Sequence, residues 1–398
     1  MKESTLPIPG LMLMLAGLTA MAPFATDAYL PAVPSMATAL DTSVHNIELS
    51  ISLFLGGFSI GQLIGGPFSD HYGRRISIFI GLILFCSASL AITLTPSVEW
   101  LWLFRILQAI GGGMTVVNPA AIIRDISSGI ESARNMSRMA LIMMFAPLMA
   151  PVIGMLILKL DGWRSIFLFL FAYALIMLIT VFFKLPETRI KQAQRTHFLK
   201  RYWMVLKHRQ ALSFIFSAAL TFGGMFAFIT GSPSVYMEYF GASEALFPVL
   251  FGANIISMVV MNRLNMRLVK RFSPHTLLNI GQSIQFVTGA LLFGYIWLSS
   301  TPLLIPTVLM IMVFVGMQGL LTPNCMASTV EFFPTNSATA VAILGALGFA
   351  TGALTGSLVG LFGDGTPLPM AMIMFSCAIA GPIIRFLLYR KNPELMTS

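Results

Sequence analysis

Twelve long apolar runs follow one another along this chain, and each is long enough to cross a lipid bilayer. A membrane-spanning helix needs about 20 predominantly apolar residues, with a range of about 17–25. The runs lie at residues 8–30, 47–69, 76–95, 100–122, 138–158, 164–185, 211–232, 246–266, 276–298, 303–323, 337–360 and 366–388. Because an α-helix satisfies its backbone hydrogen bonds inside a bilayer, we expect an all-α membrane protein with twelve transmembrane helices.

Composition excludes a soluble globular protein. Hydrophobic residues make up 57% of the 398 residues and charged residues only 10%, against about 25% charged in soluble domains. A net charge of +9 would suggest nucleic-acid binding in a soluble chain, but basic residues of membrane proteins gather in cytoplasmic loops. We therefore expect no nucleic-acid partner. The three cysteines all lie in apolar runs, so we expect free packing thiols.

The distribution of basic residues predicts the orientation in the membrane. An even number of spans places both termini on one side, and if that side is the cytoplasm, 21 of the 24 Lys and Arg residues lie in cytoplasmic loops or helix ends. The positive-inside rule therefore favours cytoplasmic N and C termini. The first run is expected to remain as a helix, not to be cleaved as a signal peptide, because Asp27 lies near the place of any cleavage site.

A basic segment at 186–210 separates six predicted helices from six others. We interpret residues 1–185 and 211–398 as two six-helix bundles, the arrangement of a transporter built from two parallel repeats. The segment is expected to be a solvated cytoplasmic linker beside anionic headgroups, although a dedicated partner site is an alternative. Its seven basic residues are Arg189, Lys191, Arg195, Lys200, Arg201, Lys207 and Arg209.

Two charged residues lie inside predicted spans and not at their ends. Asp27 falls in the outer third of the first span, and Arg105 lies about 7–8 Å below the outer boundary of the fourth. An isolated charge in hydrocarbon costs at least about 2.5–3.5 kcal/mol, so each must face a partner or water. One interpretation is a static ion pair between the two. The other, which we favour, is a titratable carboxylate that lines a cavity, with the nearby prolines shaping the end of the helix.

Other polar residues within the spans are candidates for a substrate cavity. They are Tyr29, Gln108, Asn118, Asn254, Gln318 and Asn324. The three glycines at 111–113 follow no strand and precede no Lys-Ser/Thr pair, so they do not form a phosphate-binding loop and favour close helix packing instead. The five histidines are scattered over loops, and the chain carries no metal-binding or nucleophile motif, which argues against an enzyme.

The short loop between the second and third spans carries a cluster of charges. Gly73 is expected to end the preceding helix, and Arg74 would lie at the cytoplasmic surface. Asp70 is either a helix cap or part of a conformational lock. In the second interpretation, it meets the positive N-terminal end of the helix that begins near 335–338, and also Arg124.

Proline and glycine spacing marks two further helices. Pro147, Pro151 and Gly154 recur on one face of the fifth span, where they would bend the helix and permit close approach. In the eleventh span, glycines follow one another at four-residue spacing from Gly348 to Gly360. Both patterns are explained either by packing alone or by a role in rocking the two halves.

Several motifs together resemble those of the major facilitator superfamily. The superfamily-wide ones are GGPFSDHYGRR at 65–75, LFRILQAIGGG at 103–113, the helix 5 antiporter motif APLMAPVIG at 146–154, and PET at 186–188. Those that resemble the bicyclomycin- and chloramphenicol-resistance branch of drug exporters are TDAYLPAVP at 26–34, IRDI at 123–126 and VEFFP at 330–334. The chain departs from the antiporter motif, which usually ends GPxxGG, because it has Ala150 before Pro151 and Met155 after Gly154.

The resemblance implies drug/H⁺ antiport by alternating access in a bacterial inner membrane. It assigns proton coupling to Asp27 and Arg105, and the cytoplasmic lock to the cluster around Asp70. It further implies a monomer that is driven by the proton gradient without a cofactor or metal, with a small drug or metabolite, protons and lipids as its partners. An uncoupled facilitator or importer of a small nutrient is the alternative.

Overall fold

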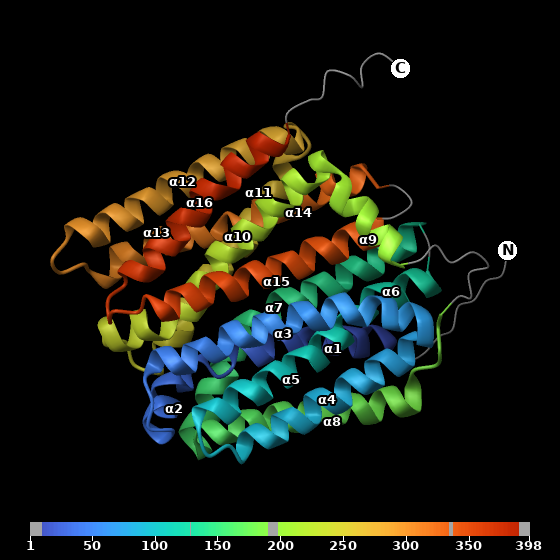
Figure 1. The fold of residues 1–398 in the computed structure, drawn as a ribbon, viewed down its shortest axis with the longest axis horizontal. Helices are drawn as coiled ribbons and strands as arrows, with labels where there is room; N and C mark the ends of the chain where they lie inside the picture. Colours follow the sequence, from blue (N-terminus) through green and yellow to red (C-terminus); the bar gives the residue numbers. More distant parts are fainter. Residues whose placement is uncertain (1–9, 128, 190–197, 334–336, 390–398) are drawn as a thin grey trace.

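A computed structural model describes residues 10–127, 129–189, 198–333 and 337–389, and the regular elements in these ranges are all helices (Figure 1). The first part of the chain forms α1 (Leu11–Asp27), the 3₁₀-helix η1 (Leu30–Ala32), α2 (Val33–Ala39), α3 (Val44–Tyr72), α4 (Arg74–Thr93), α5 (Val98–Val116), α6 (Asn118–Ile126), α7 (Gly129–Asp161) and α8 (Trp163–Lys184). The second part forms α9 (Phe198–Lys207), α10 (Arg209–Pro233), the π-helical turn η2 (Ser234–Tyr239), α11 (Phe247–Leu268), α12 (Pro274–Leu298), α13 (Leu304–Gly316), α14 (Gln318–Glu331), α15 (Ser337–Leu361) and α16 (Leu368–Leu388).

The predicted membrane helices are confirmed. Among the described residues, eleven helical stretches are long and apolar enough to cross a membrane. The helix α7 covers the remaining apolar run, at 138–158, so each of the twelve runs contains a helix in its described part. The first described helix starts, and the last one ends, at the same end of the bundle, as an even number of spans requires (Figure 1).

Four spans are interrupted, and the interruptions occupy corresponding places in the two halves. The first span continues through η1 and α2 to Ala39, so its predicted end at residue 30 is wrong; Pro31 and Pro34 sit at the starts of short helices, where a missing N–H is tolerated. The seventh span likewise passes from α10 into η2 at Pro233. The fourth and tenth spans break at Val117 and Met317. These are the places where a repeated transporter fold is expected to form its binding site.

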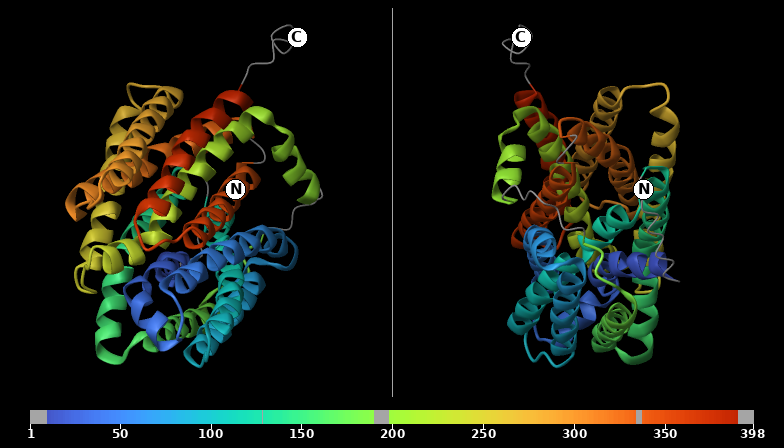
Figure 2. Two further views of the ribbon diagram at one scale, coloured as in Figure 1. Left: turned by 60° about the vertical axis from the view of Figure 1, so that its left-hand side comes forward. Right: turned by 90° about the vertical axis from the view of Figure 1, so that its right-hand side faces the viewer.

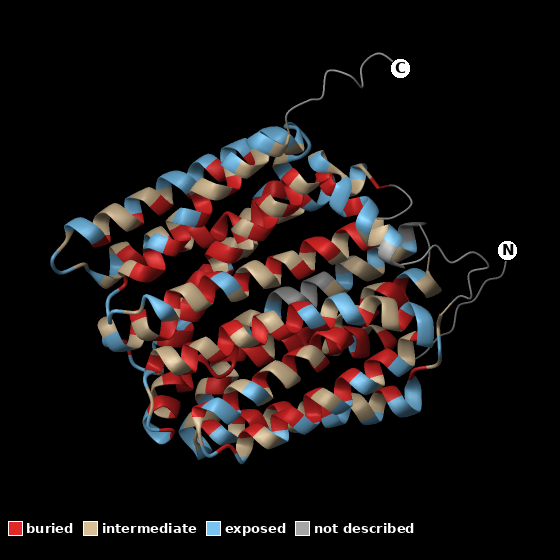
Figure 3. Ribbon diagram, viewed as in Figure 1, coloured by how far each residue is buried: buried red, intermediate tan, exposed pale blue. Residues whose placement is uncertain are grey.

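The first eight helices pack mainly against one another, as do α10–α16, and the two groups meet chiefly along α3 and α15 and also along α7 and α11. Figures 1 and 2 show α15 lying along α3, and the Ser59 hydroxyl donates to the Ala346 carbonyl across this contact at 2.8 Å. Buried residues are most frequent in the first span and in the span that begins with α10, whereas exposed ones follow the outer helices α8 and α12 (Figure 3). The exposed residues there are largely apolar, as expected of a surface that faces lipid.

The glycine row of α15 is a packing face, as its spacing predicts. Gly348 and Gly352 lie directly against the rings of Phe222 and Phe226 on α10. Gly356 lies between Ser52 of α3 and Thr230 of α10, where a methyl group would approach both hydroxyl oxygens too closely. The row therefore allows one helix to contact both halves of the molecule at short range.

Candidate functional site

Asp27 is the last residue of α1 and lies where the first span breaks. It is only 4% exposed, and its Oδ1 atom has no hydrogen-bond partner among the described residues. The hydroxyl of the preceding residue, Thr26, donates back to the Ala22 carbonyl at 3.1 Å. A buried carboxylate oxygen without a protein partner requires a proton, water or a ligand. The arrangement fits a site that binds and releases a proton or a ligand.

Arg105 lies fully buried beside the same break but does not pair with Asp27. Its NH1 group donates to the carbonyl of Ala25 at 2.9 Å and to Oε1 of Gln108 at 2.7 Å. Within the described residues, no ion pair joins its guanidinium to the Asp27 carboxylate. The static ion pair considered from the sequence is therefore wrong in this structure. Arg105 instead holds the backbone of the helix turn that carries Asp27.

Aromatic rings enclose the Arg105 guanidinium. Its central carbon lies 4.5 Å from the ring centre of Tyr29 and 4.3 Å from that of Phe54. A cation over an aromatic face is stabilised by the ring quadrupole. Tyr29, predicted as a cavity residue, also shares a hydrogen bond of 2.9 Å with Ser50 on α3. Phe54 was missed by sequence reasoning, because the sequence contains 32 phenylalanines and its spacing alone does not distinguish this one.

Gly154 of α7 presses against the break from the other side. A Cβ atom at this position would overlap the backbone carbonyl oxygen of Ala28, the residue after Asp27. Pro147 and Pro151 lie inside α7, which continues past both as a single helix, and the bend predicted for them stays a prediction. The glycine that the helix 5 motif retains is thus the one that allows α7 to reach the end of α1.

The remaining cavity candidates divide into two groups. Gln108, Asn118 and Asn324 hold neighbouring helices together: Gln108 donates to Ser89 at 2.8 Å, Asn118 accepts from Ser69 at 2.5 Å, and Asn324 donates to Asn265 at 2.7 Å.

The second group keeps unsatisfied polar atoms in the interior. Asn254 donates to the Leu250 carbonyl at 2.8 Å, but its Oδ1 atom has no partner among the described residues. Gln318 begins α14 at the break of the tenth span, and neither its Oε1 nor its Nε2 atom has a partner in the described part of the chain. These two side chains are the predicted residues with polar atoms still available to a ligand.

A buried carboxylate near the outer end of α3 links the two halves. Glu48 has no exposed side-chain surface, and its Oε1 accepts a hydrogen bond from the backbone N–H of Ser234 at 3.0 Å, where η2 begins. Its Oε2 lies 3.2 Å from Nδ1 of His45. Glu48 was not singled out from the sequence. The signal for its role is that Ser52, Gly56 and Ser59 share its face of α3.

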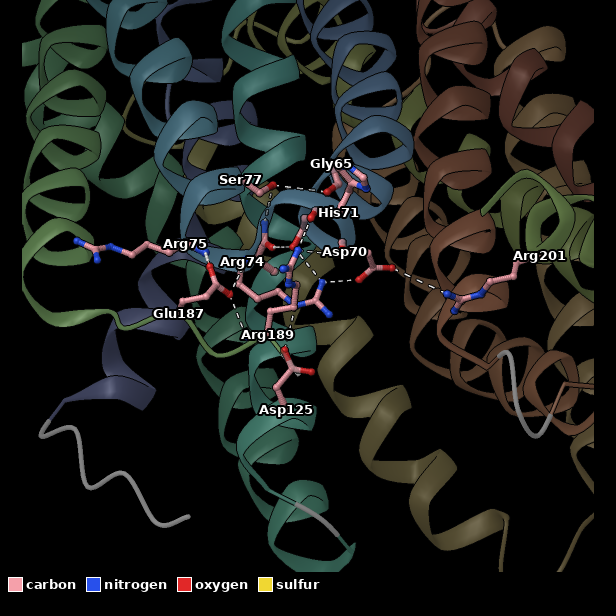
Figure 4. A network of polar contacts seen from close by, with 12 residues as sticks. Gly65, Asp70, His71, Arg74, Arg75, Ser77, Asp125, Glu187, Arg189 and Arg201 are labelled. Atoms are coloured by element: carbon pink, nitrogen blue, oxygen red, sulfur yellow. Dashed lines mark hydrogen bonds and ion pairs between the residues drawn. The ribbon is translucent and has the colours of Figure 1, made fainter. Parts of the chain in front are cut away.

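At the cytoplasmic end, Arg74 is the centre of a polar network (Figure 4). Its NH1 group donates to Oδ1 of Asp70 at 2.7 Å, and its Nε group donates to Oδ2 of Asp125 at 3.0 Å. The Asp70 side chain is 53% exposed, whereas that of Asp125 is 15% exposed. Asp125 therefore holds the better shielded of the two ion pairs. It belongs to the IRDI motif, which was the available signal for it.

The predicted partners of Asp70 are not the observed ones. Its Oδ2 atom lies 4.0 Å from NH1 of Arg201 on α9, and Arg124 is exposed without an ion pair to Asp70 in the described residues. The described part of α15 begins at Ser337 and is not paired with Asp70, while residues 334–336 lie outside the description. The predicted pairing with Arg124 is wrong. Arg74, which lies one turn after Asp70, forms the ion pair with it instead.

Glu187, in the PET motif, binds the loop between α3 and α4. Its carboxylate accepts hydrogen bonds from the backbone N–H groups of Arg74 and Arg75 at 3.0 and 3.2 Å, which caps the first turn of α4. Gly73 ends α3 as predicted, with φ of 117°, and a side chain there would collide with the Glu187 carboxylate. The segment after α8 thereby fastens α3, α4 and α8 together.

Comparison with known proteins places these features in a family. A model described as "Major Facilitator Superfamily" matches residues 15–318. A "Bicyclomycin resistance protein homolog" of Haemophilus influenzae is 34% identical over 96% of each chain. A "Chloramphenicol resistance protein" of Pseudomonas aeruginosa is 30% identical over 71% of this chain and 67% of its own length.

Solved structures share the fold at low sequence identity. A bacterial homologue of the human lysosomal transporter Spinster superposes with a TM-score of 0.77 at 14% identity, covering 98% of this chain and 100% of the other. The xylose transporter XylE of Escherichia coli gives a TM-score of 0.72 at 16% identity, covering 97% and 98%. Both similarities concern the arrangement of helices alone.

Proposed function

Because the chain belongs to the Major Facilitator Superfamily, we propose that it exports drugs or small amphipathic metabolites in exchange for protons, by alternating access. The protein is a multi-pass transporter of the bacterial inner membrane and not an enzyme. Its relatives are named for resistance to bicyclomycin, chloramphenicol and multiple drugs. The proposal takes the proton gradient as the energy source, requires no cofactor or nucleic acid, and treats the monomer as the working unit.

The observation that carries the proposal is the buried carboxyl group of Asp27, whose Oδ1 atom has no hydrogen-bond partner and which forms no ion pair with Arg105 among the described residues. An acid whose only purpose was to balance Arg105 would be paired with it, and in this structure it is not. A buried carboxyl group without a partner is stable when protonated and becomes an anion when water or a cationic or polar ligand reaches it. Asp27 is thus suited to exchange a proton for a substrate.

Coupling follows if proton and substrate compete for Asp27. Opening to the more acidic outside lets Asp27 accept a proton and release the substrate, and opening inward returns the proton and lets substrate bind. Each ligand shifts the same conformational equilibrium, so each must weaken the binding of the other by the same factor. Arg105 positions the turn, and the interruption of the first span lets this turn change shape without unfolding a continuous helix.

The decisive test is uphill transport by protein reconstituted in liposomes with an imposed pH gradient. Chloramphenicol and bicyclomycin serve as the first probes, selected by a susceptibility panel of cells with and without the protein. Asp27→Asn should insert normally, since a neutral amide is cheaper to bury than a charge, but should lose uphill export. The matched control is Asp41→Asn, which removes an exposed carboxylate and should transport normally.

Accumulation by Asp27→Asn at the wild-type level would overturn the proposal. It would favour a different coupling residue. If neither the wild type nor the variant responds to the pH gradient, while substrate still equilibrates across the membrane, the protein is an uncoupled facilitator.

A further inference from the structure

The helix α9 presents a mixed basic and apolar stripe to its surroundings. Lys200, Trp203, Met204 and Lys207 follow the i, i+3, i+4, i+7 spacing that places side chains on one face of a helix. All four are exposed, with Trp203 at 60%. The opposite face packs on the protein, where Val205 is fully buried among residues of the second half.

The position of α9 brings this stripe to the level of the lipid headgroups. Lys207 ends α9, and the membrane span of α10 begins two residues later at Arg209. Seen from the cytoplasmic end, α9 lies at the perimeter of the bundle and not over its centre (right panel of Figure 2). An exposed face at the perimeter, directly beside the start of a span, meets the membrane–water interface.

We propose that this stripe binds the headgroups of anionic phospholipids in the cytoplasmic leaflet. Tryptophan prefers the interface, where its ring meets the acyl boundary and its N–H meets the headgroups. Lysines near an anionic membrane surface are attracted to it. Nζ of Lys207 lies 5.2 Å from the centre of the Trp203 ring, so the structure already places a cation beside the interfacial aromatic. The occupant therefore has an acidic phosphate and an acyl chain.

Lipid binding to α9 would also affect the contact that this helix makes with the first half of the protein. Arg201 extends from the opposite side of α9 toward Asp70 of the first half, with NH1 and Oδ2 4.0 Å apart. The same helix contacts α10 and α15 of the second half. A lipid that holds α9 at the membrane surface therefore also holds the connection between the loop around Asp70 and the second half.

Brominated lipids test the proposal, because bromine quenches tryptophan fluorescence only at contact range. The full-length protein is reconstituted in phosphatidylcholine vesicles that contain either brominated phosphatidylglycerol or brominated phosphatidylcholine at equal mole fraction. The Trp203 signal is the difference between the wild type and Trp203→Phe, since the sequence has five tryptophans. We expect stronger quenching by the anionic lipid, with a contact preference of about fivefold for each lysine that contributes, and weakening of that preference by high salt.

Matched variants distinguish lipid binding at this stripe from a general effect of the protein's net charge. Lys200→Gln with Lys207→Gln should abolish the preference, whereas Lys270→Gln with Arg271→Gln removes the same charge from another exposed cytoplasmic loop and should leave it intact. Equal quenching by the two lipids, or equal loss in both double variants, would overturn the proposal. Absence of quenching by either lipid would overturn it as well, and would show that the stripe faces water and is open to a protein partner.

Discussion

Gly154 of α7 lies so close to the backbone carbonyl of Ala28 that no side chain fits between them. The contact joins the helix that carries the antiporter-like motif to the residue that follows Asp27. The two segments are more than a hundred residues apart in the sequence, yet they form one wall of the candidate proton site. Movement of α7 relative to α1 must therefore displace the turn that carries the carboxylate.

Gly154→Ala is expected to destabilise the protein and to abolish transport. The added methyl group overlaps the Ala28 carbonyl, and such overpacking typically costs about 1–3 kcal/mol. Thermal unfolding of the purified protein and transport in liposomes measure the two effects. Gly294→Ala is the control, because no atom lies within 4 Å of a Cβ there. Two variants of equal stability and activity would contradict the close contact.

Glu48→Ala is expected to loosen the outer contact between the two halves. It removes the acceptor of the Ser234 N–H, and a buried polar group without a partner costs about 1–3 kcal/mol. That penalty shifts the balance toward states with separated outer ends by about 5–150-fold.

A cysteine at Ser52, on the α3 face that meets α15, reports this change. In a background without the three native cysteines, its labelling by a membrane-impermeant maleimide from outside should be faster in Glu48→Ala. Asp41→Asn, which removes a nearby exposed carboxylate, should label at the original rate. Unchanged labelling in Glu48→Ala would show that Glu48 does not hold the outer ends of the two halves together and contributes to local packing alone.

Arg105→Lys is expected to lower stability although it conserves the charge. A compact ammonium group cannot stack between Tyr29 and Phe54 while donating to both Ala25 and Gln108. Loss of one hydrogen bond from a charged group costs about 1.5–3 kcal/mol. The melting temperature should fall further than in Arg164→Lys, an exposed arginine over a tryptophan ring. Similar melting temperatures would argue that the Arg105 enclosure contributes little.

Asp125→Asn is expected to reduce stability more than Asp70→Asn. Both residues pair with Arg74, but the Asp70 side chain is 53% exposed and the Asp125 side chain only 15%. An exposed ion pair contributes about 0–1 kcal/mol, and a shielded one more. Thermal unfolding of both single variants at low salt gives the comparison. A larger loss in Asp70→Asn would instead support the lock that the sequence placed there.

The sequence predicted the helices well because their signal is local. An apolar run of the right length has no alternative to a helix in a bilayer, so the spans follow from hydropathy. Side-chain partners depend on how each helix is rotated about its axis, which hydropathy does not determine. Asp27 and Arg105 were placed at the same depth correctly, yet the guanidinium points at the Ala25 carbonyl and not at the carboxylate.

The contacts of two acidic residues were not predicted, for a different reason. Glu48 and Glu187 lie near helix ends, where charges are ordinary, and each acts through backbone N–H groups far away in the sequence. The sequence pattern of a single helix or loop does not predict a hydrogen-bond partner in a distant segment. The motifs that contain Asp125 and Glu187 were recognised, but a motif gives the residue and not the atom that it contacts.

The interrupted spans have a mechanical consequence. They comprise 28 to 31 residues, as in Leu11–Ala39 and Arg209–Tyr239, whereas α4, α8 and α16 span the membrane with 20 to 22. At about 1.5 Å per residue, the former reach more than 40 Å and so exceed a hydrocarbon core of about 30 Å. The short helices match the bilayer thickness and resist tilting, while the long ones project into water and can flex at their breaks without dragging polar ends into lipid. Under the proposed alternating access, the short helices would keep a fixed position in the bilayer while the interrupted spans change their tilt.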